Sequence, residues 1–294
     1  MSLPPNLMPE PNPEQREELP EAGIVTEAPF VQGPDAATVI EPIAAVPPAP
    51  RFPPWSWWDV VAVLVFTLFI VIGFSVAALF IAHSMPEYRN VPFTELATNA
   101  GVVIGAQATA YPIVILLMFV LVRSRSHERF GSAVRWNWPG FAAPGFFLGG
   151  IVLAIVVESG SRFLPIPKSL PVDKFFNTTT SAYLMAVFGT TLAPLLEELF
   201  FRGLLYPLLR RAFRLSIAVA LTGAAFAAIH GAQLGYAWAP VLSIFVVGVV
   251  FTLIRERTGS VASAFVTHCG YNFTLFSLLW VASDHYRHLE KLAG

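Results

Sequence analysis

Seven long apolar stretches constrain the fold of this chain more than any other feature. Each is close to the roughly 20 residues that an α-helix needs to cross a bilayer. They span residues 57–82, 101–122, 141–163, 181–209, 214–232, 238–255 and 260–283. Only 13% of all residues are charged, about half the usual share in a soluble domain. The sequence therefore predicts an integral membrane protein, all-α, folded as a polytopic transmembrane helix bundle of about seven to eight spans.

The segments outside the bundle have a different composition. Residues 1–54 are rich in proline and hold eight acidic side chains, which predicts a disordered N-terminal tail. The bundle would occupy residues 55–283, and residues 284–294 would form a short C-terminal tail. Arginines gather in three alternate loops, at 123–135, 210–214 and 255–257. Because such loops favour the cytoplasm, we expect a bacterial cell membrane protein with a cytoplasmic N-terminus.

Three of the spans carry polar side chains that are costly in lipid and are usually functional. The set consists of Glu197, Glu198 and Arg202 in the fourth span, His230 in the fifth, and His268 and Asn272 in the seventh. At about 1.5 Å per residue, Glu197, His230 and His268 lie roughly 15–25 Å from the arginine-rich loops. Because their depths agree, we predict that they converge on one site.

Helical spacing divides this set into roles. Glu198 and Arg202 are four residues apart and can form an ion pair, whereas Glu197 is turned about 100° from Glu198. His268 and Asn272 are also four apart, so both can donate hydrogen bonds to one point. Pro194 predicts a break in the fourth span. A helix that restarts at this proline would carry both glutamates in its first turn.

The chemistry that suits these side chains is hydrolysis of an amide. Glu197 and His230 would deprotonate a water molecule, and His268 with Asn272 would stabilise the oxyanion. No serine stands beside the set, and Cys269 lies about 100° round the helix from His268, so a covalent acyl-enzyme is not expected. Two histidines and two carboxylates could instead hold zinc. Since Arg202 would compete with a cation, we expect no cofactor, with zinc as the less favoured alternative.

Three short motifs follow one another on separate spans: EELFFR at 197–202, FAAIH at 226–230 and HCGYN at 268–272. They fit the patterns EExxxR, FxxxH and HxxxN. Over about residues 180–280 the chain thereby resembles the CAAX-protease and bacteriocin-processing family (CPBP, or Abi) of intramembrane endopeptidases. Members of that family are mostly regarded as glutamate-dependent, although they were long described as metallopeptidases.

The resemblance implies a role for each motif residue. Glu197 looks like the catalytic glutamate, with Glu198 and Arg202 as its motif partners. His230 looks like the histidine that helps to activate water, and His268 and Asn272 look like the oxyanion-stabilising pair. Some relatives remove the last three residues of prenylated CAAX proteins. Bacterial relatives take part in bacteriocin maturation, self-immunity or the display of surface proteins.

The sequence therefore predicts an intramembrane endopeptidase similar to CAAX-type prenyl proteases. Its partners would be the lipid bilayer and a peptide or protein substrate, lipidated or not. The net charge of -1 gives no indication of nucleic acid. One alternative is an ion-coupled transporter, because glutamate and histidine in a membrane also form proton relays. The first three spans lack a second segment like APLLEELFFR, which counts against that reading. A catalytically silent immunity or scaffold protein is a further alternative.

Overall fold

The computed structural model describes residues 53–288, which form helices and loops without a strand in that range. The prediction of an all-α protein is confirmed. Most of the predicted N-terminal tail, 1–54, lies outside the described residues, as does 289–294 at the other end. The first residues of the predicted C-terminal tail, 284–294, pack against the bundle. Tyr286 is buried, and its hydroxyl donates to the carbonyl of Phe276 at 2.8 Å.

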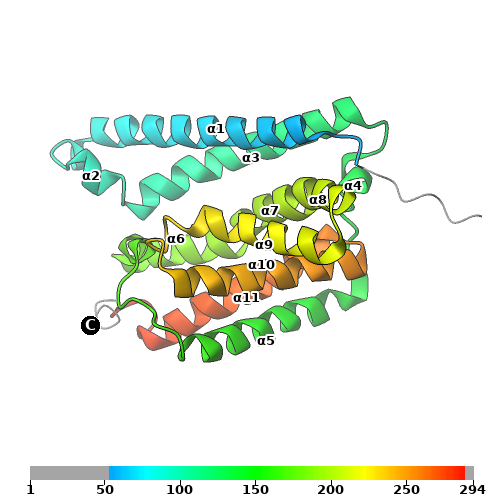
Figure 1. Cartoon of the computed structure of the whole chain (residues 1–294). Coiled ribbons are helices and arrows are strands. Elements are labelled where there is room, and N and C mark those ends of the chain that lie inside the picture. Colours follow the sequence, from blue (N-terminus) through cyan, green and yellow to red (C-terminus); the bar gives the residue numbers. More distant parts are fainter. Residues whose placement is uncertain (1–52, 289–294) are drawn as a thin grey trace, which may run out of the picture. The chain divides into compact units, whose positions relative to one another are not determined.

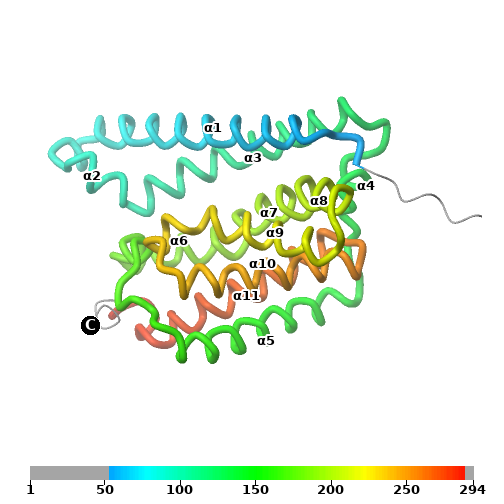
Figure 2. Tube along the Cα trace, viewed as in Figure 1, coloured from blue at the N-terminus to red at the C-terminus, as the bar shows by residue number. Residues whose placement is uncertain are grey.

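Helical runs that alternate in direction make up the described part (Figures 1 and 2). They are α1 (Trp57–Ser84), α3 (Ala100–Arg125), α5 (Ala143–Ser161), the interrupted run Thr179–Ala212, α9 (Leu215–His230), α10 (Trp238–Thr258) and α11 (Val261–Ala282). Short helices lie in the connections: α2 (Phe93–Leu96), α4 (Phe130–Ala133), η1 (Pro86–Tyr88), η2 (Gly140–Ala142) and η3 (Pro171–Phe176). The connections that follow α3, the run Thr179–Ala212 and α10 lie at the end of the bundle where α1 begins.

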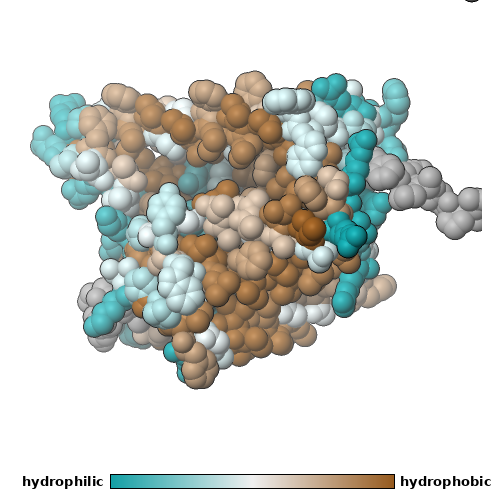
Figure 3. Space-filling view, in the orientation of Figure 1, coloured by the Kyte–Doolittle hydropathy of each residue, from teal (hydrophilic) through white to brown (hydrophobic). Residues whose placement is uncertain are grey.

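Five helices within residues 53–288 are long and apolar enough to cross a membrane. They match five of the seven predicted spans. Of the other two, α9 has 16 residues and falls short of the length of a span. The last, α11, has 22 residues, but polar residues such as His268 and Asn272 lower its mean hydropathy. Figure 3 shows hydrophobic residues over the middle of one face and hydrophilic residues towards both ends. The chain is an integral membrane protein.

The run Thr179–Ala212 is interrupted at the position that carries the glutamates. It consists of α6 (Thr179–Thr190), α7 (Leu192–Glu198), the π-helix η4 (Leu199–Leu205) and α8 (Tyr206–Ala212). The break falls at Thr191, where φ is -120° and ψ is -75°. Pro194, which lies in α7, explains this break. In a continuous helix its ring would clash with the carbonyl of Thr190. The fourth span is therefore broken, as Pro194 predicts, but the helix restarts at Leu192, and both glutamates lie at the end of α7 rather than in its first turn.

Two glycines allow α11 to pack closely against α5. A Cβ atom on Gly150 would overlap the carbonyl oxygen of Thr267, and one on Gly270 would overlap the carbonyl oxygen of Phe147. Small residues permit this approach between helices in lipid. His268 lies between these two contact points in the sequence of α11, so the contact fixes the helix that carries it.

Gly150→Ala is expected to lower the free energy of unfolding by about 1–3 kcal/mol, since the added methyl group must push α5 away from α11. Thermal unfolding of the purified protein, followed by tryptophan fluorescence in one detergent, measures this effect. Gly149→Ala is the matched control, because a Cβ atom there meets nothing within 4 Å. Equal melting temperatures for the two variants would contradict the close contact.

Candidate active site

The side chains singled out in the sequence come from three parts of the bundle. Glu197 and Glu198 end α7 and Arg202 lies in η4, while His230 ends α9 and His268 and Asn272 belong to α11. A π-helix carries one extra residue per turn and is frequent at functional sites. Here it follows directly after the two glutamates. Glu197 lies near both histidines, and Glu198 contacts both Arg202 and His268.

Glu198 and Arg202 form a buried ion pair, as their spacing predicts. Arg202 Nη1 donates to Glu198 Oε1 at 2.8 Å, and the exposed fraction of both side chains is 0%. Arg202 also donates from Nη2 to the carbonyl of Gly248 at 2.8 Å and from Nε to Thr252 Oγ1 at 3.3 Å. Its Cζ atom lies 4.6 Å from the ring centroid of Phe226. The arginine therefore joins the π-helix to α10 and is held on several sides.

His268 connects this ion pair to Glu197. Its Nδ1 atom lies 2.9 Å from Glu198 Oε1, and since an ionised carboxylate only accepts hydrogen bonds, Nδ1 is the donor. The imidazole packs against Phe251, with 4.6 Å between the ring centroids. These contacts direct Nε2 towards Glu197, where it lies 3.7 Å from Oε2. Glu198 therefore orients His268 rather than facing the open part of the site.

His230 approaches the other oxygen of Glu197. Its Nδ1 atom donates to the carbonyl of Phe226 at 2.8 Å, which leaves Nε2 at 3.9 Å from Glu197 Oε1. Both imidazoles thus present Nε2 to one carboxylate. Separations of 3.7 and 3.9 Å are too long for direct hydrogen bonds. A water molecule to the side of these pairs, about 2.8 Å from each polar atom, could bridge them.

The two glutamates differ in their access to solvent. The exposed fraction is 18% for the Glu197 side chain and 19% for that of His230, whereas Glu198 is fully buried. His230 is the last residue of α9, and turn residues 231–236 follow it. The open side of the site therefore lies beside a helix end and a loop, not behind a continuous wall of helix.

Asn272 makes a separate contact. Its Nδ2 atom donates to the carbonyl of Gly189 at 2.7 Å, near the end of α6. His268 and Asn272 share a face of α11, but their hydrogen bonds lead to Glu198 and Gly189 respectively. Their joint role at an oxyanion stays a prediction.

Metal binding is the alternative use of this donor set. Within residues 53–288, no group of three or more His, Cys, Asp or Glu side chains is placed to hold a metal ion. Glu198, the second carboxylate of the set, accepts hydrogen bonds from Arg202 and His268 through Oε1. The expectation that no cofactor takes part stays a prediction and needs a chelator test.

Residues 179–274 match a family model described as Rce1-like, type II CAAX prenyl endopeptidase. The predicted family resemblance is confirmed. This Rce1-like segment covers about a third of the chain and contains all six predicted site residues. A search of the curated proteins and a search of the solved structures gave no match. The family match supports a membrane protease and leaves the mechanism to be argued from the site.

The Rce1-like segment also contains partners of Arg202 that the sequence did not reveal. Gly248 and Thr252 lie on α10, one turn apart, and Thr252 Oγ1 donates to the carbonyl of Gly248 at 2.7 Å. A threonine that bonds to its own helix is ordinary in a membrane span. No feature of the sequence distinguishes Thr252 from the other threonines of the spans.

Proposed function

We propose that this protein is an intramembrane endopeptidase in which Glu197 and His230 activate a water molecule. The observation that carries the proposal is the arrangement of Nε2 of His230 and Nε2 of His268 around one carboxylate, at 3.9 and 3.7 Å. A carboxylate in this position can accept a proton from a water molecule held beside it and the two imidazoles. The family match at 179–274 supports peptide hydrolysis as the reaction.

In the reaction Glu197 would act first as a general base and then as a general acid. Glu197 takes a proton from the water molecule while the water oxygen attacks the peptide carbonyl. Nε2 of His230 accepts a hydrogen bond from the same water. The proton on Glu197 then passes to the nitrogen of the leaving peptide. His268, in its doubly protonated form, would donate from Nε2 to the oxyanion, with Glu198 holding Nδ1. Arg202 touches none of the reacting atoms and acts as a positioning residue.

The substrate we infer is a peptide or protein at the membrane, lipidated or not. An apolar hollow of about 350 Å³ lies between α6 and α11 and is lined by Val187, Thr191, Phe276 and Trp280, among others. Thr191 is six residues before Glu197, or roughly 9 Å along a helix. A bound chain could therefore place an apolar group in the hollow while its peptide bond reaches Glu197.

We infer that the arginine-bearing loops lie in the cytoplasm. The connections after α3, α8 and α10 share one end of the bundle with the start of α1 (Figure 1). The positive-inside rule places this end in the cytoplasm of a cell membrane, which we take to be bacterial, with the N-terminus on that side.

His230→Ala is expected to reduce peptide cleavage about 100-fold or more, because the attacking water loses an acceptor. The assay uses the full chain in lipid vesicles, a set of peptides with and without a prenyl group, and mass spectrometry of the products. His127→Ala, an exposed loop histidine, is the control and should retain full activity. Wild-type cleavage should persist with a chelator. Loss of activity that zinc restores would overturn the proposed mechanism, and absence of cleavage by folded wild type would overturn the protease assignment.

A further inference from the structure

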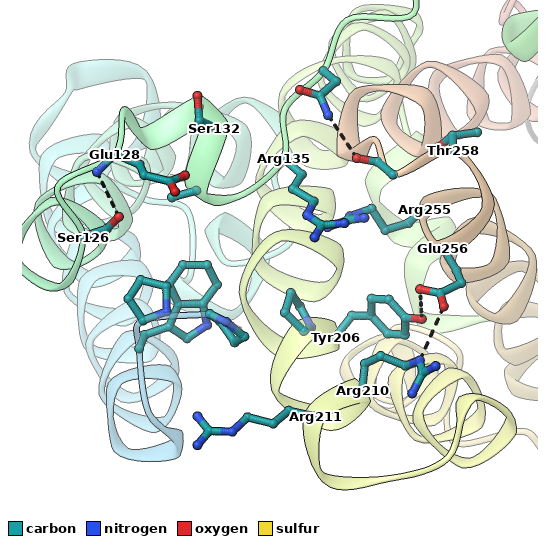
Figure 4. Close-up of a pocket in the computed structure, with 17 residues that line it drawn as sticks. Ser126, Glu128, Ser132, Arg135, Tyr206, Arg210, Arg211, Arg255, Glu256 and Thr258 are labelled. Carbon is teal, nitrogen blue, oxygen red and sulfur yellow. Dashed lines mark hydrogen bonds and ion pairs between the residues drawn. The ribbon is translucent and has the colours of Figure 1, made fainter. Parts of the chain in front are cut away.

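A second, larger hollow lies at the end of the bundle where α3, α8 and α10 terminate (Figure 4). Its volume is about 1280 Å³. Four arginines line it, Arg135, Arg210, Arg211 and Arg255, against two glutamates, Glu128 and Glu256. The lining therefore has two more positive than negative side chains. None of these residues belongs to the candidate active site.

Arg255 is the side chain that most needs a ligand. Only 4% of the residue is exposed, and its Nε atom is buried without a hydrogen-bond partner among residues 53–288. The carboxylate of Glu256 lies nearby, but its oxygens accept from the Tyr206 hydroxyl at 2.7 Å and from Arg210 Nε at 3.4 Å. A buried charged donor without an acceptor is costly. An anion in the hollow would remove this cost.

Arg135 adds a second guanidinium beside the first. It interacts electrostatically with Arg255, and Figure 4 shows the two side chains directed towards each other across the hollow. Two like charges at close range repel each other. Their proximity therefore has to be maintained by the surrounding structure, or by an anion between them.

The backbone around Arg135 keeps this residue close to Arg255. Arg135 has φ of 59°, in the left-handed region that residues with a side chain rarely adopt. Its carbonyl accepts from the Val261 amide at 2.9 Å, Asn137 Nδ2 donates to the Gly259 carbonyl at 3.1 Å, and Ser260 Oγ donates to the Asn137 carbonyl. These bonds fasten the loop of Arg135 to the turn just after Arg255. Backbone strain held in this way is a feature of binding sites.

We propose that this hollow binds the phosphate group of an anionic phospholipid between Arg135 and Arg255. Guanidinium groups match the oxygens of a phosphate with paired hydrogen bonds. The hollow lies where helices that can span a membrane end, and this is the level of the lipid headgroups. Trp55, which also lines it, donates from its indole nitrogen to the Leu204 carbonyl at 3.0 Å. Tryptophan is typical of the headgroup level.

The test measures lipid binding to the full chain by native mass spectrometry, in a neutral detergent. Phosphatidylglycerol is the anionic probe and phosphatidylcholine the zwitterionic one. Wild type is expected to bind phosphatidylglycerol more tightly than phosphatidylcholine. Arg255→Met is expected to weaken that binding about tenfold or more, because a charged donor to the phosphate is lost. Arg135→Gln changes an exposed side chain, tests the same site independently of folding, and should weaken binding similarly.

Arg257→Gln is the matched control. It removes the same charge from the same helix, but Arg257 is exposed and does not line the hollow. This variant should bind phosphatidylglycerol like wild type. Equal affinity for the two lipids would overturn the proposal, as would unchanged binding by both Arg135→Gln and Arg255→Met. If inorganic phosphate or a peptide with a free C-terminal carboxylate displaces the lipid at equal concentration, the ligand is not a lipid headgroup.

Discussion

Replacing Glu197 by glutamine is expected to lower the rate of peptide cleavage by about 10²- to 10⁴-fold, the usual contribution of a general base. Glutamine has the same shape as glutamate but cannot take a proton from water. The nearest partners of the Glu197 carboxylate among residues 53–288 are the two Nε2 atoms at 3.7 and 3.9 Å, so the change breaks no direct hydrogen bond. The side chain is also partly exposed. The melting temperature should therefore remain close to that of wild type.

Glu158→Gln is the control for this variant. It makes the same chemical change at an exposed position of α5, on a helix that carries no site residue. Cleavage by this control should equal that of wild type, whereas Glu197→Gln should lower kcat much more than it raises KM. If Glu197→Gln retains activity within a few-fold of wild type, the base is not Glu197. A proton-flux measurement on the same variants would then test the transporter alternative.

The location of the site could be predicted because its residues contrast with their spans. Glutamate, arginine and histidine are rare in apolar helices, and counting along each span placed Glu197, His230 and His268 at one depth. In the structure, the carboxylate oxygens of Glu197 lie 3.7 Å from Nε2 of His268 and 3.9 Å from Nε2 of His230. The ion pair of Glu198 and Arg202 followed from helical spacing alone. These features depend on residue type and periodicity, which a single sequence contains.

The partner of Asn272, the exact position of the helix break and the burial of Arg255 could not be predicted. The spacing of His268 and Asn272 indicates a shared face, but the acceptor for Asn272 is the backbone carbonyl of Gly189, which has no sequence signature. Pro194 indicates a break within the preceding turn without identifying Thr191. Arg255 ends a span, where a long side chain is expected to reach water. The structure buries it, because the loop of Arg135 folds over the end of α10.

Arg202→Met is expected to lower the free energy of unfolding by about 3–5 kcal/mol, because it leaves the buried carboxylate of Glu198 without its counter-charge. Methionine has a similar length, so the loss comes mainly from the charge and the hydrogen bonds to Glu198, Gly248 and Thr252. Denaturant unfolding in mixed micelles measures it. Arg257→Met, at an exposed position, should unfold like wild type.

The double variant Glu198→Leu with Arg202→Met separates folding from catalysis. Replacing both members of a buried ion pair by apolar residues often costs little stability, so the double variant should be more stable than Arg202→Met alone. It should still cleave poorly, because His268 loses the carboxylate that accepts from Nδ1 at 2.9 Å. A double variant that is both stable and fully active would show that the pair does not position His268. A single variant as stable as wild type would show that the charge of Glu198 is neutralised without Arg202.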